Sequence, residues 1–355
     1  MRFVHRPDMF TAFSSRTSGS KCSGKLPAVL LCLTAFFATP GTTAAQSKLE
    51  PAPTKWTLSE KYKKDADART NISGASCTTK SPPFTSCLVV NDEKKYAQFF
   101  SIEGTVINPG KVIRLVDENA KGNPDSEGAS YDNGYFYITG SHGRSRHHPE
   151  KNSDPSYVVF RLPVDKATGM PTFDVSADKV VGVEASHRLR EAIKDKVSAF
   201  YDQPLSDNGA NIEGIAVQHG RMYLGLRGPS DNSSAFIISV DAEAVFTPDK
   251  NLDAVARTLH LGPHTGIRDL AAVSNGLLVL TGPVNEQAVI PSVLHWNPTT
   301  GALGLPNELK IPDVAAEAKA ETLLILKDVD DEPWRALVMF DGPENGAPTE
   351  YILPR

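Results

Sequence analysis

A short sequence phrase occurs five times along the chain, and in four of its copies an acidic residue holds the same position, followed by small and apolar residues. Glu127, Glu213, Asp269 and Glu321 hold this place in four copies, and Ser73 holds it in a fifth. Carboxylates brought close together repel one another, which raises their pKa values unless a positive charge neutralises them. A hard cation with several oxygen ligands would do so, and Ca²⁺ tolerates irregular geometry better than Mg²⁺. The repeat therefore predicts a metal site with Ca²⁺ as the candidate ion.

A structural role explains the same acids equally well. Each carboxylate could accept hydrogen bonds from backbone N–H groups of a neighbouring unit, or pair with Arg227 or Arg268. Both interpretations remain open at the level of sequence.

A second phrase follows the first at a nearly constant distance and consists of a short β-rich run closed by a turn. It ends near Asp92, His142, Arg227, Thr281 and Asp341 in the five copies. Glycine and proline follow directly in the last three copies, as is typical of a turn. Each unit therefore begins with a strand, a turn and a second strand.

The spacing of the repeat predicts a β-propeller. From Ser73 the copies follow at intervals of 54, 86, 56 and 52 residues, and three of these are near the ~40–50 residues of a four-stranded blade. We predict an all-β fold with five blades; six blades are the alternative if the long interval hides a degenerate unit. Apolar residues at 189, 193 and 197 have helical spacing, so we expect a short helical insertion near residues 186–200 instead.

The last unit ends at residues 350–353 and lacks an outer strand. Closing the ring with a strand from the other end of the chain removes an exposed sheet edge. The segment Lys55–Leu58 precedes the first unit, and we predict that it completes the fifth blade. Residues 46–69 then form a closing strand and linker, and residues 70–355 form the propeller domain.

The first 45 residues have the pattern of a secretory signal peptide. Lys21 and Lys25 precede an apolar core at residues 26–38, and small residues follow at 43–45. This core is shorter than the ~20 residues that a membrane-spanning helix needs. We expect an exported protein, periplasmic or extracellular, with no membrane span in the mature chain.

Cys77 and Cys87 are the cysteines that follow this leader, on either side of the first predicted hairpin. In an oxidising compartment they should form a disulfide. The formal net charge of −5 argues against nucleic acid as a partner. We expect a monomer.

The inner strands of a propeller line its central channel, so the repeated acids and the ends of the second phrase should meet at one mouth. Arg144, Arg227 and Arg268 could hold a phosphate or carboxylate there. His142 or Glu213 would then activate a water molecule. A solvated basic loop at residues 143–148 is the alternative for that segment.

Four phrases carry a resemblance to known proteins: residues 126–131, 211–216, 266–271 and 340–343. They resemble a family of bacterial exported β-propellers whose function is unassigned. The Glu-Gly pairs at Glu127 and Glu213 are also similar to those of the esterase-like phytase family and, more weakly, of calcium-dependent gluconolactonase-like propellers. The first resemblance implies export and a propeller across the domain. The second implies Ca²⁺ and ester hydrolysis.

Two functions from different classes are compatible with these observations. The first is a metal-dependent hydrolase of phosphate or carboxylic esters, with the four acids holding the ion. The second is a noncatalytic periplasmic propeller that binds a ligand or a protein at the channel mouth, with structural acids. The sequence has no Gly-x-Ser-x-Gly, Gly-x-x-x-x-Gly-Lys-Ser/Thr or Gly-x-Gly-x-x-Gly motif, which argues against a serine hydrolase and a nucleotide site.

Overall fold

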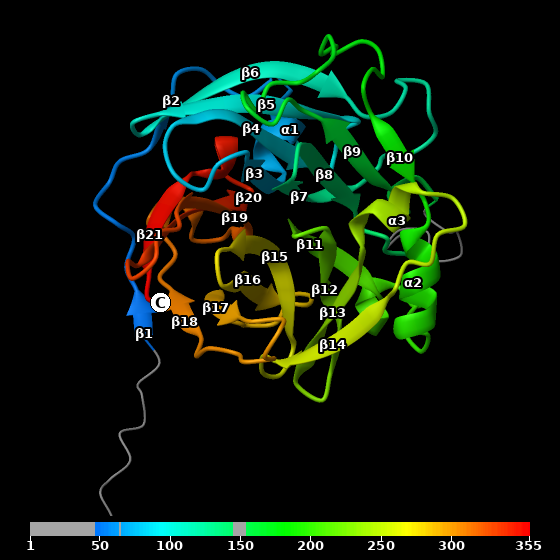
Figure 1. The fold of residues 1–355 in the computed structure, drawn as a ribbon. Helices are drawn as coiled ribbons and strands as arrows, with labels where there is room; N and C mark the ends of the chain where they lie inside the picture. The colour runs from blue at the N-terminus through cyan, green and yellow to red at the C-terminus, as the bar shows by residue number, and fades with distance from the viewer. Residues whose placement is uncertain (1–46, 64, 145–153) are drawn as a thin grey trace, which may run out of the picture. The chain divides into compact units, whose positions relative to one another are not determined.

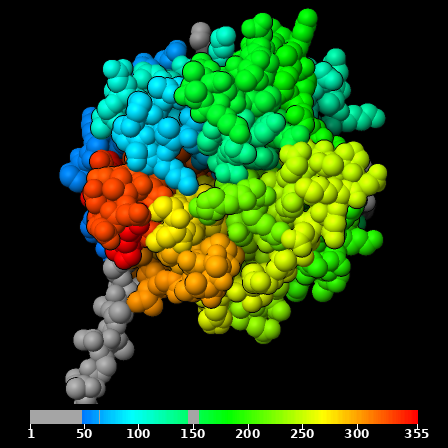
Figure 2. Space-filling model, in the orientation of Figure 1, coloured from blue at the N-terminus to red at the C-terminus, as the bar shows by residue number. Residues whose placement is uncertain are grey.

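The strands form five antiparallel sheets, which are the blades of a β-propeller. The computed structural model describes residues 47–63, 65–144 and 154–355, so the predicted signal peptide lies outside the described residues. Each blade runs from an inner strand at the channel to an outer strand, and the blades follow one another around the ring in chain order (Figures 1 and 2). The predicted five-bladed fold is confirmed.

The first two blades contain the following strands. Blade one has β3 (Ile72–Cys77), β4 (Phe84–Asn91), β5 (Tyr96–Glu103) and β6 (Val106–Arg114). Blade two has β7 (Ser126–Asp132), β8 (Tyr135–Gly140), β9 (Val159–Pro163) and β10 (Glu184–Ser186).

The remaining three blades repeat this order, and the last has one strand fewer. Blade three has β11 (Asn211–Gln218), β12 (Arg221–Asp231), β13 (Ser234–Asp241) and β14 (Val255–His260). Blade four has β15 (Thr265–Val273), β16 (Gly276–Pro283), β17 (Ser292–Trp296) and β18 (Asn307–Leu309). Blade five has β19 (Lys319–Lys327), β20 (Trp334–Asp341) and β21 (Thr349–Leu353).

A bulge interrupts the inner strand of every blade at the same place. The pairing of the inner strand with the second strand skips Ser73, Glu127, Glu213, Arg268 and Glu321. A bulge leaves the skipped residue outside the ladder and redirects its side chain. In blade four the skipped residue is Arg268, so the predicted ring of acids is displaced by one residue there. A cation takes the place that Asp269 was expected to hold.

Small residues after the bulge allow neighbouring inner strands to approach closely. A Cβ atom at Gly214 would lie 2.8 Å from the backbone carbonyl carbon of Asp269 in the next blade, and one at Gly74 would lie 2.6 Å from the Cα atom of Gly128. Side chains do not tolerate such contacts, so glycine is required at both positions. The Glu-Gly pair therefore reflects packing between blades.

The N-terminal belt, residues 47–58, joins three blades. Its strand β1 (Ser47–Leu49) pairs with β18 of blade four, and β2 (Thr57–Leu58) pairs with β6 of blade one, both in parallel. Between them, the backbone N–H of Ala52 donates to the carbonyl oxygen of Glu350 in β21, at 2.8 Å.

The prediction that Lys55–Leu58 completes the fifth blade is therefore wrong. The belt passes the outer edge of that blade and gives its strands to the neighbouring blades. Proline has no backbone N–H to donate to a ladder. Because Pro51 and Pro53 flank Ala52, this part of the belt cannot form a continuous ladder along β21.

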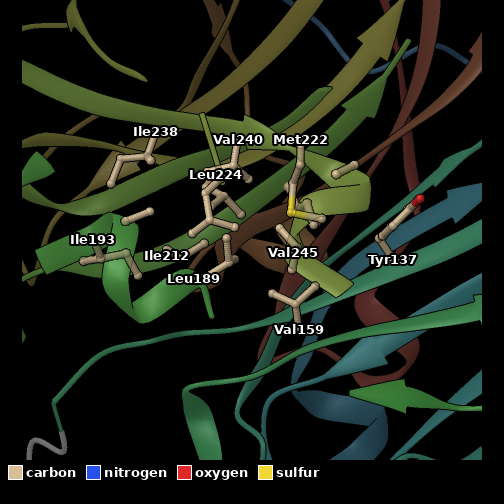
Figure 3. Close-up of a cluster of buried hydrophobic side chains, with 14 of the residues drawn as sticks. Tyr137, Val159, Leu189, Ile193, Ile212, Met222, Leu224, Ile238, Val240 and Val245 are labelled. Atoms are coloured by element: carbon tan, nitrogen blue, oxygen red, sulfur yellow. The ribbon is translucent and has the colours of Figure 1, made fainter. Parts of the chain in front are cut away.

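The long interval between blades two and three contains the predicted helix, α2 (Leu189–Lys196). Leu189, Ile193 and Val197 are buried against side chains of blade three, as Figure 3 shows for the first two. The other α-helices in the part of the chain that the structure describes are α1 (Ala66–Thr70) and α3 (Ala242–Phe246). Among the described residues no helix is long and apolar enough to cross a membrane.

Cys77 and Cys87 form a disulfide between directly paired residues of β3 and β4. Closing a loop of this length stabilises the fold by about 2.8 kcal/mol in the chain-entropy model. We expect the double replacement Cys77→Ala, Cys87→Ala to lower the free energy of unfolding by about 2–3 kcal/mol, measured by urea denaturation. Wild type treated with a thiol reductant is the control and should match the variant, whereas an unchanged stability would contradict the prediction.

Candidate functional site

One mouth of the channel opens into a cavity of about 300 Å³ with an acidic wall. Asp92 follows β4, Asp125 precedes β7, and Glu127 is the bulged residue of β7. One carboxylate oxygen from each of the three lies within 4.8 Å of the other two. Asp341, the last residue of β20, lines the same cavity. Carboxylates from three blades thus converge.

Cationic residues form another part of the cavity wall. Arg144, Arg227 and Lys319 line it. The Nη1 atom of Arg227 donates to Oε1 of Glu213 at 2.9 Å, and its Nε atom donates to the carbonyl oxygen of Val284 at 2.7 Å. These bonds fix the guanidinium in place.

Arg268 divides the ring of acids by engaging two of them. Its side chain is 1% exposed, Nη2 pairs with a carboxylate oxygen of Glu321, and the same atom lies 3.5 Å from Oε2 of Glu213. Two of the four predicted metal ligands therefore have guanidinium partners. Only Glu127 of that set belongs to the convergent acids at the mouth.

Asp269, the fourth predicted ligand, does not line the cavity. Its carboxylate accepts hydrogen bonds from the backbone N–H of Leu270 and from that of Leu323 in blade five, each at 2.7 Å. Burial raises the pKa of Asp269 well above its usual value, although the two N–H groups favour the ionised form. This residue bonds one blade to the next.

We expect Asp269→Asn to lower the free energy of unfolding by about 2 kcal/mol, because an amide oxygen replaces only one of the two carboxylate acceptors. Urea denaturation measures the loss. Glu308→Gln is the control, because this residue lies in a short outer strand of the same blade. A loss no larger than that of the control would contradict the role of Asp269 between blades.

Burial and mutual repulsion perturb the acids at the mouth. The pKa of Asp92 is raised to about 8, first by burial and then by the charges of Asp125 and Asp341. Burial and the charge of Glu213 raise the pKa of Glu127 well above its usual value. Burial also raises the pKa of Asp341, although Arg268 lowers it. Burial and mutual repulsion therefore disfavour ionisation of these acids more than the neighbouring cations favour it.

His142 was predicted to activate water, but the structure does not bring it to the cavity. The residue is buried, and its ring stacks on Tyr157 with centroids 6.1 Å apart. Burial and the charge of Arg190 lower its pKa to about 3. His142 belongs to the loop that carries Arg144. The rest of that loop, residues 145–153 with His147 and His148, lies outside the described residues.

Several cavity residues were not assigned a role from the sequence. Asp125, Asn211 and Lys319 line the cavity, and each lies two residues before a bulged glutamate. Side chains two residues apart in a strand point to the same face. Extending the repeat by one such step toward the N-terminus would have found all three.

Four polar atoms of the cavity-lining residues are buried without a hydrogen-bond partner among the described residues. Two are oxygens, Oδ1 of Asp92 and Oδ1 of Asn211, and two are guanidinium nitrogens, Nε of Arg144 and Nη2 of Arg227. Buried polar groups ordinarily have partners. Acceptors for a cation and donors for an anion are thus present in one cavity.

Comparison with protein families finds one described as "Protein of unknown function (DUF3616)", which matches residues 87–350. No curated protein matches the chain.

Solved structures that resemble this chain at low sequence identity include three proteins of named function. Regucalcin of Agrobacterium tumefaciens, a calcium-binding protein, is 11% identical over 86% of this chain and 95% of that one, with a TM-score of 0.37. An exo-β-1,3-galactanase of Phanerochaete chrysosporium is 9% identical over 86% of this chain and 63% of that one, with a TM-score of 0.44. The GH43 β-1,3-galactosidase BT0265 is 8% identical over 85% of this chain and 58% of that one, with a TM-score of 0.45. The chain spans less than two thirds of the length of the last two proteins.

Proposed function

The chain belongs to the DUF3616 family of proteins of unknown function, and from its cavity we propose that it binds a divalent cation, with Ca²⁺ as the candidate, and a small anionic ligand beside it. Asp92, Asp125 and Glu127 would hold the cation, and Arg144 and Arg227 would hold the anion. The observation that carries this proposal is the combination of orphaned acceptors and orphaned donors in one cavity.

The geometry of the acids fits a calcium ion. Ca²⁺ binds oxygen at 2.3–2.6 Å, so two ligands of one ion lie at most about 5 Å apart. The 4.8 Å spread of the carboxylate oxygens is within that limit. The raised pKa values of Asp92 and Glu127 support this assignment, because a bound cation would favour their ionised forms.

Hydrolysis of a phosphate or carboxylic ester is the reaction that this site would support. The bound ion would polarise the ester and lower the pKa of a water molecule. Arg227 Nη2 and Arg144 Nε would orient the anionic group. Asp341, whose pKa is raised, is a better candidate than His142 to carry a proton, because it lines the cavity. The disulfide supports a location outside the cytoplasm.

Noncatalytic binding of a ligand at the same cavity is the second candidate. It is favoured by the pairing of Glu213 and Glu321 with Arg268, which uses predicted functional acids for structure.

The test is titration of the chelated protein with Ca²⁺ and Mg²⁺, followed by calorimetry and thermal unfolding. We expect Ca²⁺ to raise the melting temperature of the wild type by several degrees, and Asp125→Asn to abolish this response. Glu321→Gln is the matched control: it should be less stable yet keep its response, because Arg268 already engages Glu321. A wild type that responds to neither ion would refute the proposal.

A screen with phosphate monoesters and lactones then separates the two candidates. Turnover that requires Ca²⁺ and is lost in Asp125→Asn would establish the hydrolase. Binding of Ca²⁺ and inorganic phosphate without turnover of any ester would favour the noncatalytic protein.

A further inference from the structure

The insertion between β10 and β11, residues 187–210, provides one wall of the cavity. It consists of α2 and a turn in which Leu205 lines the cavity. The turn is closed by its own backbone: the N–H of Ala210 donates to the carbonyl oxygen of Phe200 at 3.0 Å, and that of Gly209 to the carbonyl oxygen of Pro204 at 2.9 Å. The insertion is thus an ordered part of the site.

Blade three holds the insertion in place. Leu189 and Ile193 of α2 pack in the cluster that contains Leu224 and Ile238 (Figure 3). Closer to the cavity, Asn208 Nδ2 donates to the carbonyl oxygen of Ser230 at 3.1 Å, and the N–H of Ser230 donates to Asn208 Oδ1 at 2.8 Å. The insertion is therefore fixed relative to the blade that carries Arg227.

The insertion also holds the loop that follows β8. The Nη1 atom of Arg144 donates to the carbonyl oxygen of Asp202, and Arg144 forms a parallel bridge with Pro204. Arg144 consequently takes its position in the cavity wall from the insertion rather than from its own blade alone.

Arg190 of α2 holds both the loop that carries Arg144 and the turn of the insertion, on the side away from the cavity. Its Nη1 atom donates to the carbonyl oxygen of His142 at 2.8 Å, and Nη2 donates to that of Tyr201 at 3.0 Å. The guanidinium also lies over the rings of Tyr157, at 4.0 Å, and Tyr201, at 3.6 Å. Arg190 is buried and does not line the cavity, so any effect on a ligand must pass through Arg144 and the turn.

We propose that the insertion is the ligand-selecting wall of the cavity and that Arg190 is its positioning residue. Arg190 sets Arg144 against the anionic group, and Leu205 contacts the uncharged part of the ligand. The ligand class is a small organic phosphate or phosphonate with an apolar substituent. This inference rests on the proposed function.

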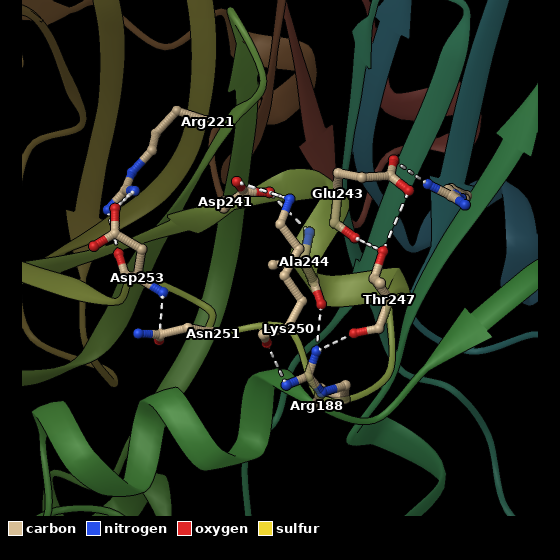
Figure 4. A network of polar contacts seen from close by, with 10 residues as sticks. Arg188, Arg221, Asp241, Glu243, Ala244, Thr247, Lys250, Asn251 and Asp253 are labelled. Carbon is tan, nitrogen blue, oxygen red and sulfur yellow. Dashed lines mark hydrogen bonds and ion pairs between the residues drawn. The ribbon is translucent and has the colours of Figure 1, made fainter.

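Arg188 provides a matched control two residues away. Its guanidinium also donates to main-chain carbonyl oxygens outside the insertion. These belong to α3 and the turn after it: Ala244, Thr247 and Lys250 (Figure 4). Arg188 therefore anchors the insertion on the side away from Arg144. Both arginines contribute to the stability of the fold, but of the two only Arg190 bonds the backbone of the loop that carries Arg144.

The test compares Arg190→Gln with Arg188→Gln by calorimetry. Ca²⁺ is titrated into chelated protein, and inorganic phosphate into Ca²⁺-loaded protein. We expect Arg190→Gln to weaken phosphate binding at least tenfold while Ca²⁺ affinity changes less than twofold. Arg188→Gln should lower the melting temperature but change neither affinity more than twofold. Arg190→Lys should recover part of the phosphate affinity, because an ammonium can still donate to the carbonyl of His142.

A second variant keeps the inference testable if Arg190→Gln does not fold. Leu205→Ala should weaken binding of phenylphosphonate about tenfold and leave inorganic phosphate unchanged. Equal phosphate affinities in Arg190→Gln and wild type, or no effect of Leu205→Ala on phenylphosphonate, would overturn the inference. So would a Ca²⁺-loaded wild type that binds no phosphate. A wild type that binds no Ca²⁺ would instead refute the proposed function.

Discussion

Replacing Arg268 with methionine will lower the free energy of unfolding by about 3–5 kcal/mol, the range for breaking one partner of a buried ion pair. The guanidinium is 1% exposed and lies between Glu213 and Glu321. Methionine fills much of the same volume but supplies no charge, so Glu321 would lose its guanidinium partner, whereas Glu213 would keep Arg227. Glu321 would then have to take up a proton or draw in water, and either response costs free energy.

Restoring neutrality tests this explanation directly. The double variant Arg268→Met, Glu321→Gln removes both charges of this pair, keeps Glu213 with Arg227, and should recover most of the lost stability, because neutral groups of similar shape are far less costly to bury. Urea denaturation of the wild type, the single variant and the double variant gives the three values. A single variant within 1 kcal/mol of the wild type, on the order of a surface pair, would show that the pairs contribute little.

The repeat predicted the blades because its spacing reports strand and turn lengths, which each blade must satisfy locally. The helix in the long interval was predictable for the same reason: Leu189, Ile193 and Val197 have the period of a helix that packs on one side. The prediction of the site residues, by contrast, depended on the register of each inner strand to within a single residue. Aligning acid with acid placed Asp269 in the ring, whereas the bulge places Arg268 there.

Matching acid with acid does not locate that bulge. Its position depends on which residue of β15 is skipped when the strand pairs with β16, and neighbouring blades influence this choice through close packing at Gly214. Predicting the path of the belt would also have required the positions of three blades, because the path depends on where Pro51 and Pro53 pass β21. Properties that depend on contacts between blades were therefore beyond a reading of the repeat.

Arg268 explains why the negative charge of the channel gathers at one side of its mouth. By engaging Glu213 and Glu321, it leaves Asp92, Asp125 and Glu127 as the convergent acids. Substituting one residue of the ring thus divides five equivalent positions into a structural part and a part suited to bind an ion.

The metal-free protein will lose stability as the pH rises from about 5 to 8, and Ca²⁺ will restore it. The folded-state pKa of Asp92 is about 8, against an ordinary value near ~3.9 in unfolded chains. The folded protein thus binds more protons than the unfolded chain between these values. The contribution of Asp92 is fully present below pH ~4 and is lost as the pH rises through the folded pKa. Glu127 and Asp341 act in the same direction.

One pKa unit corresponds to about 1.4 kcal/mol, so we expect a loss of at least about 3 kcal/mol across this range in the presence of a chelator. Asp92→Asn removes this titration and should make the metal-free protein more stable than the wild type at pH 8, while abolishing its response to Ca²⁺. Urea denaturation at pH 5 and pH 8, with chelator or with Ca²⁺, measures all four states of each protein. If the chelated wild type were equally stable at both pH values, the acids would already be compensated within the fold, and the case for a cation at this mouth would fail.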